Sequence, residues 1–259
     1  MINELNFAGR IKAFKNSTPF DHCVIEDFFE NNVALDLERE CPNFEDDLWH
    51  VYDNSLEIKK TTNLWCNFGP TTYKVLSYLN SPKFVQALSN HMGIPGLMPD
   101  IGLHGGGWHI HGKGGILNQH LDYSVHPKLG LQRKLNLIVY LNSKWEDEWG
   151  GQLGLWDSAD GMPTQISREI IPSFNKAVLF DTTQNSWHGL VSPVAGPAGE
   201  TRRSLAVYYM IRPPEDVDPR VKALFAPTES QKQNPEILDL IEKRADASHA
   251  HTTYISPEK

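Results

Sequence analysis

The short stretch "GGILNQHLDY", residues 114–123, places a histidine and a carboxylate two residues apart, at His120 and Asp122. Successive side chains of a strand point to opposite faces, so a strand over 114–123 would carry both groups on one face. The pair alone is weak evidence for a metal site, because a chain with 11 histidines and 32 acidic residues contains about one such pair by chance. A hydrogen bond between two core side chains explains the pair equally well.

A third residue, farther along the chain, strengthens the case for a metal site. His188, in "FDTTQNSWHGL", lies between two candidate strands, from which it can reach back to the first. A His-x-Asp pair with one distant histidine makes the 2-His-1-carboxylate triad, which binds iron(II) and leaves the other coordination positions open. His120, Asp122 and His188 are therefore the predicted metal ligands and catalytic centre.

Polar side chains on two further candidate strands are expected to face the same interior. "TRRSLAVYYM" places Arg202 and Ser204 on one face, and "LNLIVYLN" places Asn136 and Tyr140 on one face. An arginine inside a barrel is costly unless it meets an anion, and its planar fork suits a carboxylate. The pattern thus predicts an anion-binding group beside the metal site.

The elements that must position these residues lie at about 98–212, where short alternating or apolar runs are separated by Gly, Pro, Asn and Asp. The candidate strands lie at 101–112, 115–124, 133–142, 150–157, 168–174, 176–182, 186–194 and 202–211. About eight strands over roughly 115 residues is the spacing of a jelly roll or barrel. The predicted fold class is mainly β with flanking helices.

Helices are expected on both sides of this core. A strand leads into a helix at about 30–40, and two more helices are predicted at 70–79 and 81–92, the second closed by Gly93. An amphipathic helix is predicted at about 235–244, and the tail after it, with His249 and His251, is expected to fray.

We interpret 1–259 as a single domain. It consists of a mixed helical N-terminal part (1–97), a jelly-roll core (98–212) and a C-terminal segment with one helix (213–259). Its organisation gives no prediction of the oligomeric state.

Composition excludes several function classes. The net charge is −8 without a basic run, which argues against nucleic acid or an anionic membrane as a partner. An anionic small substrate is still compatible, because the charge inside a pocket is not set by net charge. The N-terminus lacks a signal-peptide pattern and the apolar runs are too short to span a bilayer. Three widely spaced cysteines favour a reducing compartment, so a cytoplasmic location is expected.

Four segments together resemble the iron(II)- and 2-oxoglutarate-dependent dioxygenases, in the prolyl-4-hydroxylase-like branch. They are "GGILNQHLDYSVHPK", "RKLNLIVYLNSKWEDEWGGQLGLWD", "VLFDTTQNSWHG" and "TRRSLAVYY". The resemblance implies a double-stranded β-helix of the jelly-roll, cupin-like type, with His120, Asp122 and His188 as ligands of Fe(II). It also implies hydroxylation of a small molecule or a peptidyl residue, using 2-oxoglutarate and O2 and releasing succinate and CO2, with ascorbate as an optional addition. Related enzymes with Gly or Ala in place of the carboxylate are halogenases, so Asp122 favours hydroxylation.

The same resemblance assigns the cosubstrate. Arg202 would bind the distal carboxylate of 2-oxoglutarate, with Tyr140, Asn136 and Ser204 assisting. His111, in "GGGWHIHGKGG", lies in a region that often contributes a group near 2-oxoglutarate. An ordinary core role for His111 remains the alternative.

The substrate side is less defined, because pocket-lining loops diverge fastest. Tyr123 and His109 are candidate substrate contacts, against ordinary packing roles. His126, in "SVHPK", is a weaker candidate ligand, because Pro127 indicates a turn. His22, His50, His91 and His104 are interpreted as structural.

Two other classes of protein share this β-fold. A cupin-like, metal-dependent sugar isomerase or epimerase needs neither an inward Arg202 nor 2-oxoglutarate. A non-catalytic jelly-roll binding module needs no intact triad. Protection against thermal unfolding by 2-oxoglutarate with a divalent metal would separate these classes from a dioxygenase.

Overall fold

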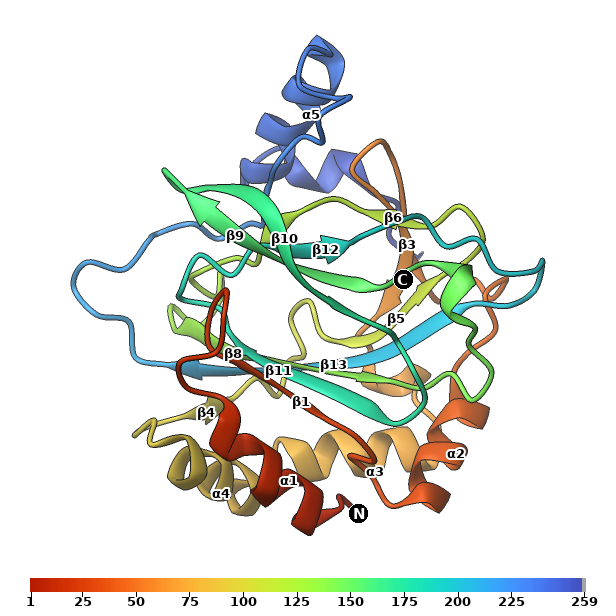
Figure 1. The fold of residues 1–259 in the computed structure, drawn as a ribbon, viewed down its shortest axis with the longest axis vertical. Helices are drawn as coiled ribbons and strands as arrows, with labels where there is room; N and C mark the ends of the chain where they lie inside the picture. Colours follow the sequence, from red (N-terminus) through yellow and green to blue (C-terminus); the bar gives the residue numbers. More distant parts are fainter. Residues whose placement is uncertain (258–259) are drawn as a thin grey trace.

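Two antiparallel β-sheets face each other at the centre of the structure, a computed structural model that describes residues 1–257 (Figure 1). The large sheet has the order β1 (His22–Ile25), β11 (Lys176–Asp181), β8 (Gln132–Tyr140), β13 (Arg202–Ile211), β5 (Gly107–His111), β3 (Glu57–Thr62) and β2 (His50–Asp53), with β4 (Met98–Pro99) on β13 and β6 (Ile116–Leu117) on β3. The small sheet has the order β10 (Met162–Ile170), β9 (Leu153–Ala159), β12 (His188–Leu190), β7 (His120–Leu121) and β14 (Leu224–Phe225). The predicted fold class, a double-stranded β-helix with flanking helices, is confirmed.

Alternation along the central strands divides the core in two. Leu135, Leu137 and Val139 of β8 pack in the cluster that includes the N-terminal helices. Tyr140, one position on, packs instead with Leu153 of the small sheet. Each buried leucine stabilises the fold by about 1.5–3 kcal/mol, so the register that turns Asn136 and Tyr140 toward the inter-sheet space is strongly specified.

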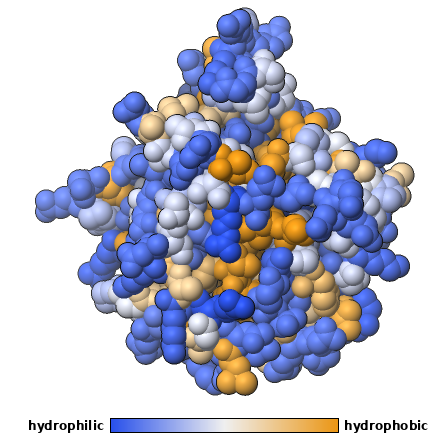
Figure 2. Space-filling view, in the orientation of Figure 1, coloured by the Kyte–Doolittle hydropathy of each residue, from blue (hydrophilic) through white to orange (hydrophobic). Residues whose placement is uncertain are grey.

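Helices cover the outer face of the large sheet, at the bottom of Figure 1. They are α1 (Glu4–Arg10), α2 (Asn31–Glu40), α3 (Pro70–Leu79) and α4 (Pro82–Met92). Short 3-10 helices lie at Ile11–Ala13, at Trp65–Asn67 and, between β8 and β9, at Asp147–Trp149. The helix α4 begins and ends as predicted, because Ser81 Oγ accepts the Phe84 N–H and Gly93 adopts a φ of 62°. In the view of Figure 2, apolar side chains gather at the middle of the face, where the two sheets meet, and hydrophilic side chains surround them.

Two strand predictions are wrong in detail. The stretch 114–123 is not one strand, because the chain crosses between the sheets at Asn118 and Gln119, so that β6 pairs with β3 and β7 with β12. The strand predicted at 168–174 begins earlier, at Met162. Asp160 and Gly161 both have positive φ (51° and 76°), which makes a tight hairpin turn between β9 and β10.

The predicted mixed start and frayed tail are also more ordered than expected. The hairpin of β2 and β3, which the sequence did not reveal, extends the large sheet beyond β5. The helix α5 (Pro235–Ala245) is confirmed, but the chain after it forms a 3-10 helix (Ala250–Thr253) and then pairs with β2. Ile255 and Val51 exchange two backbone hydrogen bonds, and the Tyr254 ring stacks on Tyr52 at 5.0 Å. The last two residues of the predicted tail, 258–259, lie outside the described residues.

Within residues 1–257, all helices are too short or too polar to cross a bilayer. Cys23, Cys41 and Cys66 are free thiols.

Candidate metal centre

The structure brings His120, Asp122 and His188 together between the sheets. His120 in β7 lies directly opposite His188 in β12, and one candidate ligand atom from each of the three residues lies within 4.8 Å of the others. Gly189 permits this approach, because a Cβ at this position would lie 2.7 Å from the carbonyl oxygen of Asn118. The three groups therefore converge as a 2-His-1-carboxylate set does.

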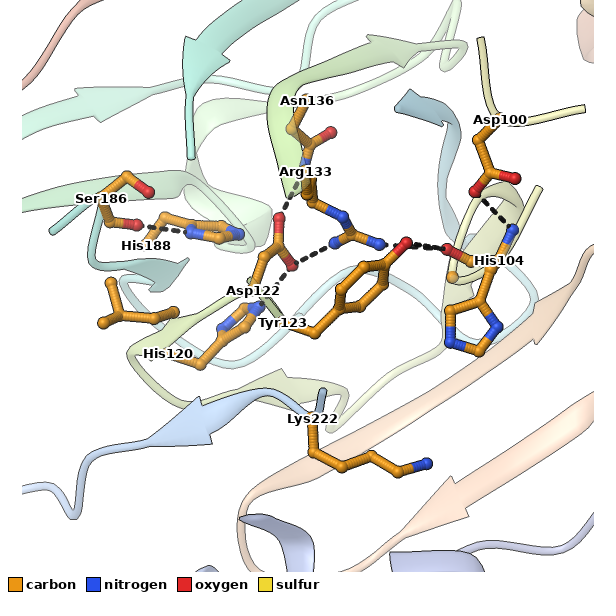
Figure 3. Close-up of polar contacts among 12 residues, drawn as sticks. Asp100, His104, His120, Asp122, Tyr123, Arg133, Asn136, Ser186, His188 and Lys222 are labelled. Carbon is orange, nitrogen blue, oxygen red and sulfur yellow. Dashed lines mark hydrogen bonds and ion pairs between the residues drawn. The ribbon is translucent and has the colours of Figure 1, made fainter. Parts of the chain in front are cut away.

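Backbone carbonyls orient both imidazoles. Nδ1 of His120 lies 3.0 Å from the Asn118 oxygen. Nδ1 of His188 lies 2.8 Å from the Ser186 oxygen (Figure 3). A carbonyl only accepts, so each Nδ1 carries the proton and each Nε2 keeps a free lone pair. Burial, followed by the His188 ring, lowers the pKa of His120 to about 3, and burial lowers the pKa of His188. Both rings are thus neutral, which is the form that binds a metal.

Asp122 is held by two side chains of β8. Its Oδ1 lies 3.1 Å from Arg133 Nη1, and its Oδ2 accepts from Asn136 Nδ2 at 2.9 Å (Figure 3). Burial alone would raise the pKa of Asp122, but the Arg133 guanidinium and the two imidazoles hold it below its ordinary value. The carboxylate is therefore ionised and fixed in orientation. The structure places Asn136 beside Asp122, and its predicted help in binding 2-oxoglutarate remains a prediction.

Arg133 is a site residue that sequence reasoning missed. It is 2% exposed, and its guanidinium carbon lies 3.4 Å from the ring centres of both Tyr123 and Tyr208. Strict alternation puts Arg133 on the outer face with Leu135. A bulge at Lys134, where Tyr209 pairs with Leu135 but Met210 pairs with Arg133, turns it inward instead. Bulges re-aim side chains in this way beside active sites, and no local sequence signal marks this one.

Arg202 lines the same cavity of about 450 Å³ that the triad lines. Its Nε donates to the Gly151 oxygen at 2.7 Å, and its guanidinium lies over the Tyr140 ring at 4.8 Å. Among the described residues, no carboxylate lies within 4.0 Å of it. Burial lowers the pKa of Arg202. The buried arginine is therefore matched by no anion within residues 1–257, whereas Arg203 is partly exposed and bonds Thr201 outside the cavity lining.

Unpartnered polar atoms gather around Arg202. His111 lies opposite Arg202 in the β5–β13 register, and both of its ring nitrogens are buried without a hydrogen-bond partner, as is the Tyr140 hydroxyl. Ser204 lies opposite Tyr140 and lines the cavity. Buried polar groups normally have partners, so these atoms fit a bound anion with several acceptor oxygens. A 2-oxo dicarboxylic acid has that chemistry.

The remaining predicted residues divide between the cavity and the fold. His109 and Tyr123 line the cavity, and so do His50 and His104, so the structural interpretation of the last two was incomplete. His126 does not join the triad. Its Nδ1 accepts the N–H groups of Lys128 and Leu129, as the predicted turn requires.

The lining of the cavity contains a buried ion cluster that the sequence did not reveal. Glu57 of β3 is fully buried, and it pairs with Lys59 at 3.0 Å and with Arg244 of α5 at 2.7 Å. Burial would raise the pKa of Glu57, but the two cations lower it to about 2. The cluster joins two segments 187 residues apart, and all three of its side chains line the cavity.

Comparisons with known proteins agree with this geometry. Residues 106–210 match the profile of the 2OG-Fe(II) oxygenase superfamily. Prolyl 3-hydroxylase OGFOD1 of Mus musculus is 26% identical over 209 residues, which are 78% of this chain and 36% of that protein. The Xenopus laevis protein of the same name is 31% identical over 223 residues, which are 83% and 41% of the two chains. The chain thus spans about two fifths of the length of these relatives.

A solved structure shares the fold. The crystal structure of a Pseudomonas putida prolyl-4-hydroxylase superposes with a TM-score of 0.57 at 17% identity, covering 80% of this chain and 99% of that one. The matched profile spans His120, Asp122, His188 and Arg202. By this match, residues 106–210 of the chain belong to the 2OG-Fe(II) oxygenase superfamily.

Proposed function

We propose that this chain is an Fe(II)- and 2-oxoglutarate-dependent dioxygenase that hydroxylates an unactivated C–H bond. One observation carries the proposal. Two neutral histidines with an ionised carboxylate, and a buried arginine that has no carboxylate partner among residues 1–257, line one cavity. The metal set alone would also suit a sugar isomerase, but Arg202 has no role in such an enzyme.

The residues divide the binding between them. His120, Asp122 and His188 would hold the iron, and Arg202 would hold the distal carboxylate of 2-oxoglutarate, with His111 beside it. When bound, Fe(II) and 2-oxoglutarate activate O2, so that one oxygen atom enters the substrate and the other enters succinate as CO2 is lost. The protein supplies binding, orientation and exclusion of side reactions.

Several side chains prepare the site before any ligand arrives. Arg133 and Asn136 fix both oxygens of Asp122, so little reorganisation is needed when the metal binds. Ile138 and Leu190 are apolar parts of the cavity wall, and they limit the water around the reacting groups. Tyr140 and Ser204 lie next to Arg202 and are proposed to assist it.

The substrate is proposed to be a peptidyl residue or a small molecule. These relatives are named as prolyl hydroxylases, so a peptidyl proline is the first substrate to test. His109 and Tyr123, which line the cavity, are proposed to contact it. We further propose that 1–259 acts as one domain in the cytoplasm, without nucleic acid or membrane as partner.

An anaerobic titration tests the proposal. Metal-free protein receives Fe(II) and then 2-oxoglutarate, and the weak visible charge-transfer band of the chelate is followed. We expect the band in the wild type, its loss in His120→Ala, and a much higher 2-oxoglutarate requirement in Arg202→Ala. Arg203→Ala is the matched control and should behave as wild type. Tight metal binding without a band would contradict the proposal and favour the cupin-like enzyme.

A further inference from the structure

The charge of the cavity is opposite to that of the chain. Its lining includes six basic residues, Lys59, Lys128, Arg133, Arg202, Lys222 and Arg244, but only the two acidic residues Glu57 and Asp122. The chain as a whole carries a net charge of −8. A cavity of one sign on a protein of the other sign concentrates ligands of opposite charge.

The surplus persists when the proposed iron and 2-oxoglutarate are bound. Both acidic groups already have partners, because Glu57 pairs with Lys59 and Arg244, and Asp122 pairs with Arg133. The two positive charges of Fe(II) and the two negative charges of 2-oxoglutarate cancel. A surplus of four positive charges therefore remains among the lining residues for the substrate to meet.

Lys222 is the clearest unmatched cation. It lies on the segment between β13 and β14, is half-buried, and has no carboxylate within 4.0 Å among residues 1–257. In Figure 3 it lies below Tyr123 with no contact drawn to it. Burial, followed by the charge of Arg244, lowers the pKa of Lys222. Its ammonium group would therefore be stabilised by an anion from outside the chain.

Lys59 is the second cation that an incoming ligand would meet. Its side chain is 12% exposed at 3.0 Å from Glu57, and Glu57 also serves Arg244. One carboxylate thus balances only one of two cations. Charge from Lys59 contributes to the lowered pKa of His109, after burial, so its ammonium group lies near the proposed substrate side.

We propose that the substrate carries a negatively charged group, a carboxylate, which binds against Lys222 and Lys59. The proposal rests on the proposed function, because it treats the cavity as a substrate site, and it narrows the substrate class to anions. The anion cannot be 2-oxoglutarate itself, since its two carboxylates are assigned to Arg202 and the metal.

Two matched pairs of probes test the proposal on protein loaded with Mn(II), which supports binding without turnover, and with saturating 2-oxoglutarate. The first pair is the peptide Ac-Gly-Glu-Pro-Glu-Gly-amide and its Gln analogue. The second pair is N-acetylproline and N-acetylprolinamide. Binding is followed by calorimetry at low salt and again at high salt, where screening weakens exposed ion pairs.

We expect the acidic member of at least one pair to bind about fivefold tighter, the upper range for a solvent-accessible ion pair. A preference within the peptide pair indicates an acidic peptide, and one within the small pair alone indicates a free acid. The preference should disappear in Lys222→Gln and shrink in Lys59→Gln. Lys83→Gln, on α4 and outside the cavity lining, is the control and should keep it.

Equal binding of the acidic and neutral members of both pairs overturns the proposal, and so does a preference that survives in Lys222→Gln. The affinity for 2-oxoglutarate, measured on the same samples, separates this failure from failure of the proposed function. If only the substrate class is wrong, 2-oxoglutarate still binds wild type and Lys222→Gln equally. If the function is wrong, 2-oxoglutarate fails to bind the wild type.

Discussion

Replacement of Arg133 by methionine should leave the buried Asp122 carboxylate without its cationic partner. Methionine keeps an unbranched chain between the Tyr123 and Tyr208 rings, but it removes the cation that lies 3.1 Å from Asp122. It also removes the hydrogen bond from Arg133 Nη2 to the His104 oxygen at 3.0 Å. Asp122 would then keep only Asn136 as a hydrogen-bond donor.

The expected cost follows from the burial of the pair. Asp122 is 9% exposed and Arg133 is 2% exposed, and breaking a buried ion pair by removing one partner costs about 3–5 kcal/mol. In an Asp122→Asn background, the Arg133→Met change leaves no buried carboxylate unpaired, so it should cost much less stability. The difference between the two costs isolates the ion pair from the lost stacking.

Urea unfolding of the four metal-free proteins, wild type, both single variants and the double variant, measures both costs. Saturating Mn(II) should restore part of the stability of Arg133→Met, since a ligand at 100 times its Kd stabilises by about 2.7 kcal/mol. Arg133→Lys, which keeps the charge, should lose less than Arg133→Met. Equal costs of Arg133→Met in both backgrounds would refute the reasoning, because the loss would then come from packing alone.

Three further predictions concern 2-oxoglutarate binding, metal binding and the buried ion cluster of Glu57. Arg202→Met should weaken 2-oxoglutarate binding by tens-fold or more, because each charge-assisted hydrogen bond contributes about 1.5–3 kcal/mol. Arg202→Lys should also weaken binding, because the planar guanidinium fork is lost. Fluorescence titration of the Mn(II)-loaded variants with 2-oxoglutarate checks both, and an unchanged affinity would show that Arg202 does not bind 2-oxoglutarate. His188→Ala should abolish stoichiometric Mn(II) binding in calorimetry, whereas His126→Ala should leave it intact, and the reverse result would assign the wrong histidine. Burial would raise the pKa of Glu57, but Lys59 and Arg244 lower it from an ordinary 4.5 to about 2. This shift contributes roughly 3 kcal/mol of stability, which is present above pH 4.5 and is lost as the pH falls toward 2. The stability advantage of wild type over Glu57→Gln in urea should therefore shrink on acidification from pH 7 to pH 3, and a constant difference would contradict the shift.

The metal ligands His120 and Asp122 could be predicted from their types and spacing, although the strand expected to carry both is broken at Asn118 and Gln119. The cosubstrate residues could be predicted because they lie on strands whose alternation is unbroken. Between Asn136 and Tyr140 each residue pairs with β13 in step, from Tyr208 back to Ser204. Counting by two therefore places these side chains, and Arg202, on the correct face. The same counting fails at Arg133 in this strand. The bulge at Lys134 adds one residue, which reverses the faces of the residues beyond it.

One other difference between the predicted and the observed strands could have been predicted from the sequence. The Asp160-Gly161 pair is a strong hairpin signal, and it would have placed β10 at its observed start. The hairpin of β2 and β3 carries no comparable signal, because its strand residues are largely polar and half-buried. Tertiary pairing with β5 gives these residues their strand conformation.

The residues that the sequence did not reveal lie mainly on the proposed substrate side. Lys59 belongs to β3 and Lys222 to the segment before β14, and both reach the cavity through contacts between segments far apart in the chain. The ion pair between Glu57 of β3 and Arg244 of α5 also lines the cavity, and neither residue belongs to the triad or to the Arg202 end of the cavity. The charge at Lys222 can therefore change by substitution without replacing a residue of the iron or 2-oxoglutarate sites. For this reason the proposed reaction type follows from the triad and Arg202, whereas the search for the substrate should start from the charges of Lys59 and Lys222.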